Sequence, residues 1–478
     1  MRVPMATSAA SALVLGLPAK RCHNVYPEPH PNDPEDDIAL VESPGSLQRN
    51  TFAAPVRGMW QADGHASGRV LIAQGTTVST FAPSTNTVSA LTGSTAGTDR
   101  GDFAFTESEG FGLFNGGLYV STGTAIAAVT DAQFATLLSD AGETAFTSVA
   151  TMGQRGLFTY GPRFGFTAVL DMDDVTALSY YTAESSPDNL IAGRVVGELY
   201  YLFGTQTIEP WAQTGDSDDP FALQPGMTQQ VGCMCRDGIV RADNTLFFID
   251  NAGNPRRLAQ GSSPILNPKD PWVTTLLKAA GAANIRGMVY EDSAHVFVIW
   301  RMPTACVVYD VLMQEWHTRD TNETDTWRWT SMVTAGTRVF VGDDAGQFDE
   351  LSRDYTSESM ADASTMGTEI VREFTAYLPV KAGRMAVKTA RLDSAKGVGA
   401  ATGQGSAPVI AMRQSRDAGN TWSSWSSRTL GAQGVYDARS IWRRRGRAKD
   451  KGLVFQFLKS DPVKCAYLGV RVNEDQAA

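Results

Sequence analysis

A unit of two short apolar strands joined by a glycine-containing turn recurs through most of the chain. Seven copies are marked by Leu71, Leu118, Leu157, Leu199, Leu246, Val296 and Val339. Consecutive copies are 47, 39, 42, 47, 50 and 43 residues apart. A repeat of about 40–50 residues built from short strands is typical of a β-propeller blade. The sequence therefore predicts a propeller of six or seven blades.

The repeats also divide the chain into segments. They place the propeller at residues 55–355, and the polar stretch 356–368, which has no strand pattern, predicts a linker. Strand patterns resume at residue 369 and predict a C-terminal antiparallel β-sandwich over 369–478. Residues 1–54 are rich in Pro and Asp, which predicts an extended segment that crosses the propeller face or joins its last blade.

Helix is scarce in this all-β pattern. One short helix is expected over Asp131–Ser139, with Asp131 as its N-cap, and another over Pro271–Ala279 after Asp270.

The charge balance and the cysteines limit the class of protein. With 41 Lys and Arg against 51 Asp and Glu, the formal net charge is −10, which argues against binding DNA phosphates by charge. Five scattered cysteines do not form a disulfide framework and favour folding in a reducing cytosol. No apolar run approaches the roughly 18 residues of a membrane span. Lys20 and Arg21 follow the apolar Ala12–Leu17 where a signal peptide needs small residues, so an ordinary N-terminal segment is expected.

Two acidic runs and one cysteine pair are the candidates for catalysis or metal binding. Asp171–Asp174 and Asp216–Asp219 contain the paired carboxylates that glycosidases need, but acidic runs in polar loops are usually solvated turns. Cys233 and Cys235 share one face of a strand, and zinc would need two further ligands at matching spacing. No Ser-His-Asp set, phosphate loop or dinucleotide fingerprint occurs. The sequence predicts no enzyme, no cofactor and no metal site.

Residues 415–422 match the S-x-D-x-G-x-T-W pattern of an Asp-box. Ser415 and Asp417 are expected to bind backbone groups of a hairpin turn, while Gly419 adopts a positive φ and Trp422 packs beneath. Asp-boxes occur repeatedly in sialidases and related glycosidases, so a propeller-type glycoside hydrolase or carbohydrate-binding protein is the alternative function. A single copy outside the propeller repeats favours a structural turn.

A basic block stands out in this acidic chain at Arg443, Arg444, Arg445 and Arg447, after Trp442. The simplest interpretation is a solvated strand end. A second is a docking patch for an acidic partner subunit, because guanidinium groups pair with carboxylates through two hydrogen bonds. DNA binding ranks third because most of the chain is acidic. We favour the subunit-docking patch.

Four parts of the chain resemble the tail hub proteins of short-tailed double-stranded DNA phages, also called tail nozzle or packaged-DNA-stabilisation proteins. They are Arg21–Glu28, which is similar to an opening Asn-x-Tyr-Pro-Glu segment, Tyr181–Asp188 with Leu199–Gly204 and Thr207–Glu209, Ala305–Asp310 with Trp316, and Tyr436–Val463.

The resemblance implies a structural virion component without catalysis. It implies a homo-oligomeric ring, a hexamer, that lies below the portal, extends the DNA conduit, retains the packaged genome and passes duplex DNA during ejection without sequence-specific binding. The implied partners are the portal-adaptor ring protein, a tail fibre or tailspike and a distal plug or needle, with assembly in the host cytoplasm. An acidic surface suits this role because DNA must slide through the conduit rather than adhere to it.

Overall fold

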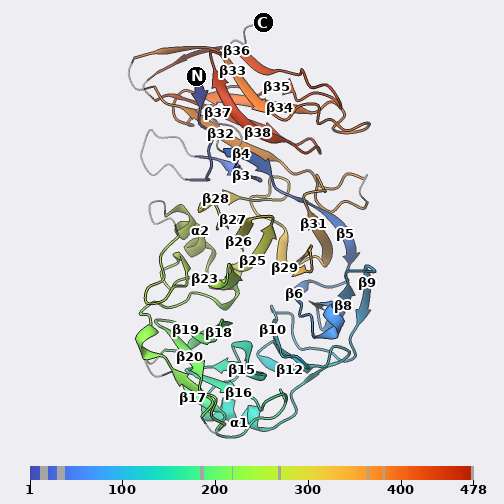
Figure 1. Ribbon diagram of the computed structural model, residues 1–478, viewed down its shortest axis with the longest axis vertical. Helices are drawn as coiled ribbons and strands as arrows, with labels where there is room; N and C mark the ends of the chain where they lie inside the picture. The colour runs from blue at the N-terminus through green and yellow to red at the C-terminus, as the bar shows by residue number, and fades with distance from the viewer. Residues whose placement is uncertain are drawn as a thin grey trace.

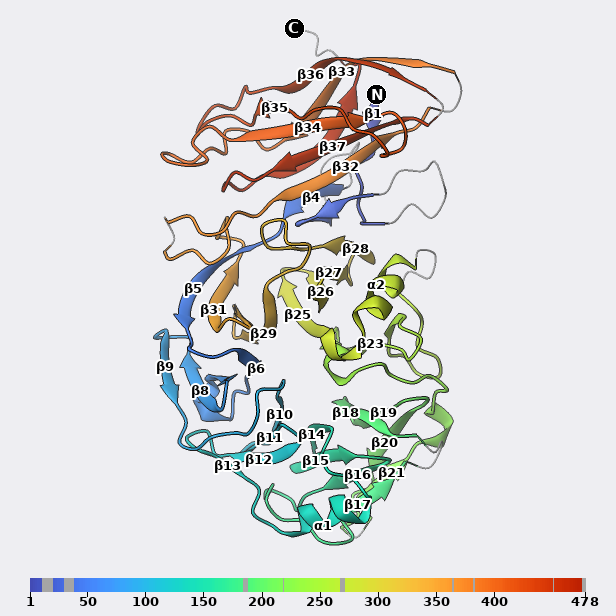
Figure 2. The same cartoon turned by 180° about the vertical axis from the view of Figure 1, so that it is seen from behind.

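The structure is a computed structural model, and it describes residues 1–10, 20–29, 38–183, 188–217, 219–266, 271–362, 365–380, 383–449 and 451–474. Figures 1 and 2 show a ring of small sheets with a β-sandwich at one end, and both chain termini lie at that end. The predicted fold class, an all-β propeller followed by a sandwich, is confirmed.

The ring of described residues contains seven antiparallel sheets, which we number as blades 1 to 7 in chain order. Blade 1 consists of β6 (Val56–Trp60), β7 (Val70–Gln74), β8 (Thr77–Ala82) and β9 (Thr87–Ala90), and blade 2 of β10 (Asp102–Phe105), β11 (Gly110–Phe114), β12 (Gly117–Ser121) and β13 (Ile126–Ala128). Blade 3 consists of β14 (Ser148–Met152), β15 (Arg155–Tyr160), β16 (Arg163–Phe166) and β17 (Tyr180–Thr182), and blade 4 of β18 (Leu190–Val196), β19 (Leu199–Gly204), β20 (Ile208–Gln213) and β21 (Phe221–Leu223). Blade 5 consists of β22 (Val240–Ala242), β23 (Thr245–Ile249) and β24 (Pro255–Arg257). Blade 6 consists of β25 (Arg286–Asp292), β26 (His295–Met302), β27 (Ala305–Asp310) and β28 (Glu315–Thr318). Blade 7 consists of β29 (Trp329–Ala335), β30 (Arg338–Asp343), β31 (Gln347–Ser352) and β5 (Gly45–Thr51).

The hydrophobic core of the propeller lies between blades rather than within them. Each pair of neighbouring blades shares one cluster of buried side chains, such as Leu157, Phe164 and Trp211 between blades 3 and 4. The other six pairs of neighbours share clusters of the same kind. A single blade cannot cover both faces of its own sheet, so the ring closes by stacking blade on blade. This packing produces the repeat seen in the sequence. Six of the seven marker residues lie on the second strand of a blade, and Leu118 lies on the third strand of blade 2.

The ring closes through the N-terminal part of the chain. β5 pairs antiparallel with β31, with Leu47 opposite Glu350, and so becomes the last strand of blade 7. Strands from both ends of the propeller segment are therefore held in one sheet, which leaves no open edge there. Residues 1–54, expected as one extended segment, contribute strands to both domains.

The sandwich also incorporates N-terminal strands. One sheet is ordered β3-β4-β38-β33-β36, with β1 beside β38, and the other continues β2-β32-β37-β34-β35. Their bounds are β1 (Arg2–Val3), β2 (Cys22–His23), β3 (Val25–Pro29), β4 (Ile38–Glu42), β32 (Arg372–Leu378), β33 (Met385–Ser394), β34 (Val409–Ser415), β35 (Ser426–Thr429), β36 (Ser440–Ala448), β37 (Leu453–Lys459) and β38 (Ala466–Val472). The core between the two sheets includes the buried rings of Phe374, Trp442, Phe457 and Tyr467.

β2 joins the two domains directly. It runs parallel to β28 of blade 6 and antiparallel to β32 of the sandwich, so one hydrogen-bonded sheet passes from propeller to sandwich. The described residues also contain two α-helices, α1 (Gln133–Asp140) and α2 (Trp272–Ala280), close to the predicted ranges. Asp131 is not the N-cap that the sequence predicted: the cap is Ala132, and the Asp131 carboxylate, one residue earlier, accepts the backbone N–H of Gln133 at 2.8 Å. Asp270 lies outside the described residues. Among the described residues, no helix combines the length and apolar character needed to cross a membrane.

Candidate functional site

The Asp-box forms the turn between β34 and β35 of the sandwich. The Asp417 carboxylate accepts the backbone N–H of Thr421 at 2.8 Å and the Thr421 hydroxyl at 2.5 Å. The Ser415 hydroxyl donates to Asp417 at 2.7 Å and accepts the N–H of Gly419 at 2.8 Å, and Gly419 has φ +97°. Both carboxylate oxygens are thus engaged within the turn itself.

Trp422 also packs within this hairpin, through a cation–π contact. The Arg413 guanidinium lies 4.7 Å from the ring centroid of Trp422 and 4.5 Å from that of Trp425. Cations near aromatic faces are attracted by the ring quadrupole, so this arrangement ties β34 to the loop that follows it.

We expect the Asp-box to make the stability of the sandwich sensitive to acid pH. The Thr421 hydroxyl and the other donors lower the pKa of Asp417 to about 2, whereas an unfolded Asp titrates near 3.9. Because the folded pKa is the lower one, the stabilising contribution is complete above about pH 4 and is lost as pH falls towards 2. We expect Asp417→Asn to lower the thermal midpoint of the sandwich at pH 6 and to reduce its loss of stability between pH 4 and pH 2. Thermal melts of both proteins across this range test it, and parallel pH profiles would contradict it.

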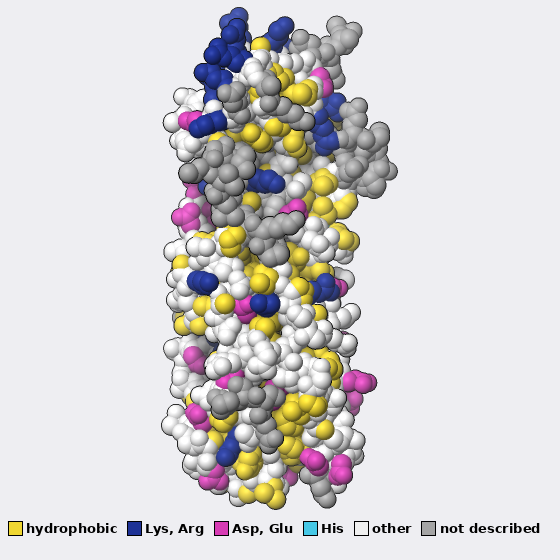
Figure 3. Space-filling model, turned by 90° about the vertical axis from the view of Figure 1, so that its left-hand side faces the viewer, with side chains coloured by type: hydrophobic (Ala, Val, Ile, Leu, Met, Phe, Trp, Pro, Cys, Tyr) yellow, Lys and Arg dark blue, Asp and Glu magenta, His cyan; other side chains and the backbone are white. Residues whose placement is uncertain are grey.

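The arginine block lies in β36, at the outer edge of one sheet of the sandwich. Arg443 pairs with Thr389 and Arg447 with Ala386 on β33, and a bulge between them gives Arg444 a φ of +58°. Arg443, Arg444 and Arg447 are exposed, while Arg445 is half-buried and donates from Nε to the Arg443 carbonyl at 3.0 Å. Within the described part of the chain, none of the four forms an ion pair with a carboxylate. Figure 3 shows Lys and Arg side chains gathered at the sandwich end of the face in view.

Formal charge is divided sharply between the two parts of the chain. Residues 371–478 contain 19 Lys and Arg against 8 Asp and Glu, a net of +11, and residues 1–370 contain 22 against 43, a net of −21. The overall −10 therefore combines a basic C-terminal part, residues 371–478, with an acidic remainder, and the arginine block belongs to the basic part.

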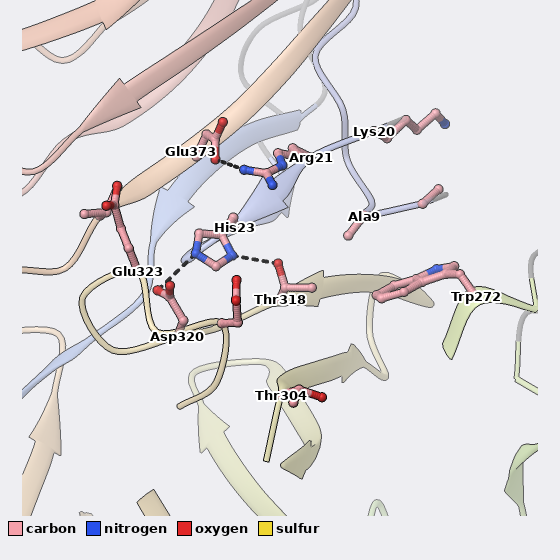
Figure 4. A pocket seen from close by; sticks show the side chains of 13 residues that line it. Ala9, Lys20, Arg21, His23, Trp272, Thr304, Thr318, Asp320, Glu323 and Glu373 are labelled. Atoms are coloured by element: carbon pink, nitrogen blue, oxygen red, sulfur yellow. Dashed lines mark hydrogen bonds and ion pairs between the residues drawn. The ribbon is translucent and has the colours of Figure 1, made fainter. Parts of the chain in front are cut away.

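A cavity of about 430 Å³ lies at the junction of the two domains (Figure 4). His23 on β2 lies between two partners there: its Nδ1 is 2.8 Å from the Thr318 hydroxyl and its Nε2 is 3.0 Å from Asp320. Arg21 pairs with Glu373 of β32 beside it. Sequence reasoning missed this group because His23 and its partners are some 300 residues apart.

A hydroxyl, an imidazole and a carboxylate in a row invite comparison with a catalytic triad. Here, however, His23 and Thr318 are directly paired residues of the parallel β2–β28 ladder. Asp320 also accepts the Asn24 side-chain amide at 2.8 Å. Burial raises the pKa of Asp320, but the hydrogen bonds from His23 and Asn24 outweigh it and leave that pKa below its usual value. The group therefore holds an N-terminal strand between the two domains.

The acidic runs and the cysteine pair also have structural partners. Asp173 accepts the Thr130 N–H at 2.5 Å and Asp219 accepts the Tyr181 hydroxyl at 2.5 Å, so both carboxylates anchor loops. Asp218 lies outside the described residues. Cys233 and Cys235 are buried free thiols whose pKa values are raised by burial. Among the described residues, no three His, Cys, Asp or Glu side chains lie close enough together to hold a metal ion.

The propeller axis is occupied by charged side chains from several blades. Arg236 donates to the Arg100 carbonyl at 3.0 Å and to the Thr147 carbonyl at 3.2 Å, and Arg194 pairs with Asp102 at 2.9 Å. The space between them is a cavity of about 90 Å³. This space is far too small for a DNA duplex, since even the major groove of B-DNA is about 12 Å wide. A duplex therefore cannot pass along the axis of one propeller.

The fold is an all-β one: blades are stacked around a closed axis, and the N-terminal strands join the sandwich to them. In the Asp-box turn, the polar side chains are hydrogen-bonded within the turn itself. Two family models match the chain: "Bacteriophage P22 Gp10, beta-propeller" over residues 20–356 and "Bacteriophage P22 Gp10, beta-sandwich" over residues 371–475. The chain belongs to this family of tail hub proteins of short-tailed phages, and it is a structural component of the virion tail that assembles with other virion proteins. The predicted resemblance is thereby confirmed, although residues 184–187 of its second segment lie outside the described residues.

No match was found among curated proteins. Among solved structures, the crystal structure of the computationally designed Ika8 protein is similar over 64% of this chain and 98% of that chain, with 9% identity and a TM-score of 0.38.

Proposed function

We propose that six copies of the protein form a ring in the tail, below the portal and its adaptor ring protein. The ring extends the DNA conduit, retains the packaged genome and passes duplex DNA during ejection, without sequence-specific binding and without catalysis. Membership of the tail hub family carries this proposal. The blocked propeller axis supports it, because a duplex then needs a passage built between subunits, and a cyclic arrangement of identical chains is the simplest way to surround one.

The division of charge supports a separation of roles between the two domains. The acidic remainder of the chain, at −21, would repel a passing duplex and keep it from adhering. The basic C-terminal part, residues 371–478 at +11, has exposed arginines that lack carboxylate partners within the described structure. We assign Arg443, Arg444 and Arg447 to a docking surface for an acidic neighbour, either the adjacent copy or the adaptor ring. A tail fibre or tailspike and a distal plug or needle complete the proposed set of partners, and assembly takes place in the host cytoplasm.

The alternative, a propeller-type glycoside hydrolase, has little support from the geometry. The single Asp-box is outside the blades, and the Asp417 oxygens are bound within its own turn. We therefore propose a structural role for Ser415, Asp417, Gly419 and Trp422.

Reversal of two arginines tests the ring and its docking surface together. Charge-paired interfaces lose specificity and association rate when one partner changes sign, and they weaken with salt. We expect the wild-type protein to assemble with the adaptor into a complex holding six copies. Arg443→Glu with Arg447→Glu should keep the wild-type thermal midpoint but remain unassembled. Native mass spectrometry of each protein, with and without the adaptor, measures the stoichiometry.

The matched control is Arg241→Glu, which reverses an exposed arginine on blade 5 and should assemble as the wild type does. A double variant that assembles normally but loses affinity for duplex DNA would make the patch a DNA contact. A double variant unchanged in both respects would make it a solvated strand end, and a wild-type complex with a single copy would refute the ring.

A further inference from the structure

The cavity on the propeller axis has an unusual excess of guanidinium groups. Arg100 precedes β10, Arg194 lies in β18, Arg236 lies in the short helix η3 (Arg236–Gly238), and Arg286 begins β25. These four residues come from blades 2, 4, 5 and 6. Arg100, Arg194 and Arg236 line the cavity, and Arg286 is next to its lining residue Gly287.

Three of these arginines share one carboxylate. Asp237 accepts a hydrogen bond from Arg236 Nε at 2.8 Å, but it is 3.9 Å from Arg100 Nε and 3.7 Å from Arg286 Nη1. The last two distances are ion-pair contacts and too long for hydrogen bonds. One negative charge therefore faces three positive charges.

The other carboxylates near the axis are already engaged. Asp102 accepts Arg194 Nη1 at 2.9 Å and the backbone N–H of Val149 at 3.2 Å. Asp99 pairs with Arg57 at 2.8 Å, and Asp344 accepts the Thr330 hydroxyl at 3.1 Å. They act on the arginines around Asp237 only through space, and none of them is hydrogen-bonded to Arg100, Arg236 or Arg286.

Several guanidinium donors have no acceptor within hydrogen-bond distance in the described structure. The Arg100 Nη1 group donates to the Thr330 carbonyl, and Arg286 Nη1 donates to the carbonyls of Ala283 and Ile285. Among the described residues, the Nη2 groups of Arg100, Arg194 and Arg286 have no acceptor. Burial lowers the pKa of Arg100; Asp237 opposes this, whereas Arg286 and Arg236 add to it.

We propose that the cavity on the propeller axis binds one small tetrahedral oxyanion, of the phosphate or sulfate type, between Arg100 and Arg194, with Arg286 close by at Asp237. Guanidinium groups bind such oxygens through paired, charge-assisted hydrogen bonds. The cavity of about 90 Å³ has room for such an ion, since one ordered water needs only about 10–15 Å³ of the same kind of space. The bound anion neutralises the excess charge and links blades 2 and 4. This site is separate from the arginine block of β36 and does not depend on how the protein assembles.

The test uses purified full-length protein dialysed into a chloride buffer. We expect radiolabelled sulfate to bind at one ion per chain in equilibrium dialysis. Sulfate or phosphate at about 10 mM should also raise the thermal midpoint of the propeller by about 2 °C over chloride at equal ionic strength, because a ligand that binds only the folded state stabilises it. Arg100→Gln should abolish both effects, and Asp237→Asn should tighten sulfate binding because it removes the competing carboxylate.

Arg443→Gln with Arg447→Gln is the matched control, since it removes two arginines from the surface block and should leave sulfate binding unchanged. Sulfate binding that disappears in this control but persists in Arg100→Gln would overturn the proposal. If Arg100→Gln fails to fold, the wild type and the surface control decide it. One saturable sulfate per chain in both supports the site, and its absence from the wild type at about 10 mM, a concentration that would saturate a built site, refutes it.

Discussion

Replacing Glu42 by Gln should lower the free energy of unfolding of the sandwich by about 3–5 kcal/mol, because it leaves buried cations without their counter-charge. Glu42 ends β4, and its carboxylate accepts Lys459 Nζ at 2.7 and 3.0 Å and the Tyr467 hydroxyl at 2.8 Å. Arg372 Nε lies 3.1 Å from the same carboxylate, as an ion pair without hydrogen-bond geometry. All four side chains are buried. Denaturant unfolding of the sandwich, followed through the buried Trp442, measures the change.

A double variant separates the loss of a counter-charge from the loss of packing. Glu42→Gln with Lys459→Met removes both members of the closest pair, and it should recover part of the lost stability because no ammonium is left unpaired. Arg372 keeps its hydrogen bonds to the Ile370 and Thr356 carbonyls in either variant. A single variant that loses less than about 1 kcal/mol would show that water already solvates the group.

Deletion of residues 1–52 should abolish the soluble monomer. It removes β5 and so opens blade 7 at β31, and it also removes β2 from between β28 and β32. Each newly exposed strand edge presents unpaired N–H and C=O groups that can pair with another chain. We expect aggregation on expression, measured as the soluble fraction and its size-exclusion profile.

A shorter deletion provides the control for the closure strand. Removal of residues 1–10 takes away β1 and its pairing with β38 but leaves β2 to β5 in place. This variant should stay soluble with a closed propeller, although the sandwich should melt earlier. An equally soluble product from the 1–52 deletion would show that blade 7 needs no strand from the N-terminal part of the chain.

Elements with a regular apolar pattern could be predicted from the sequence, and those without one could not. The blades were found because each contact between neighbouring blades demands buried apolar residues at the same place in every repeat. β36 has no clear strand pattern in the sequence, because its arginines interrupt the apolar alternation between Trp442 and Ala448. β35 is short and polar and carries no apolar alternation either.

The candidate sites divide along the same line. The Asp-box was recognised because all its hydrogen bonds lie within eight consecutive residues. The axial arginines gave no local signal because each stands alone in its own repeat. Arg100, Arg194, Arg236 and Arg286 lie in or near the first strands of their blades but at different offsets, so aligning the repeats would not have brought them into one column.

By itself, the sequence determined the fold class, the order of the domains, the Asp-box turn and the family, because each of these follows from residues that are close together or regularly repeated. Only the tertiary structure decided which strand closes blade 7, how β2 joins the domains, where Glu42 meets Lys459 and which arginines meet on the axis. Those contacts join residues tens to hundreds of positions apart. Such pairings depend on how the whole ring closes, and no local pattern of side chains encodes them.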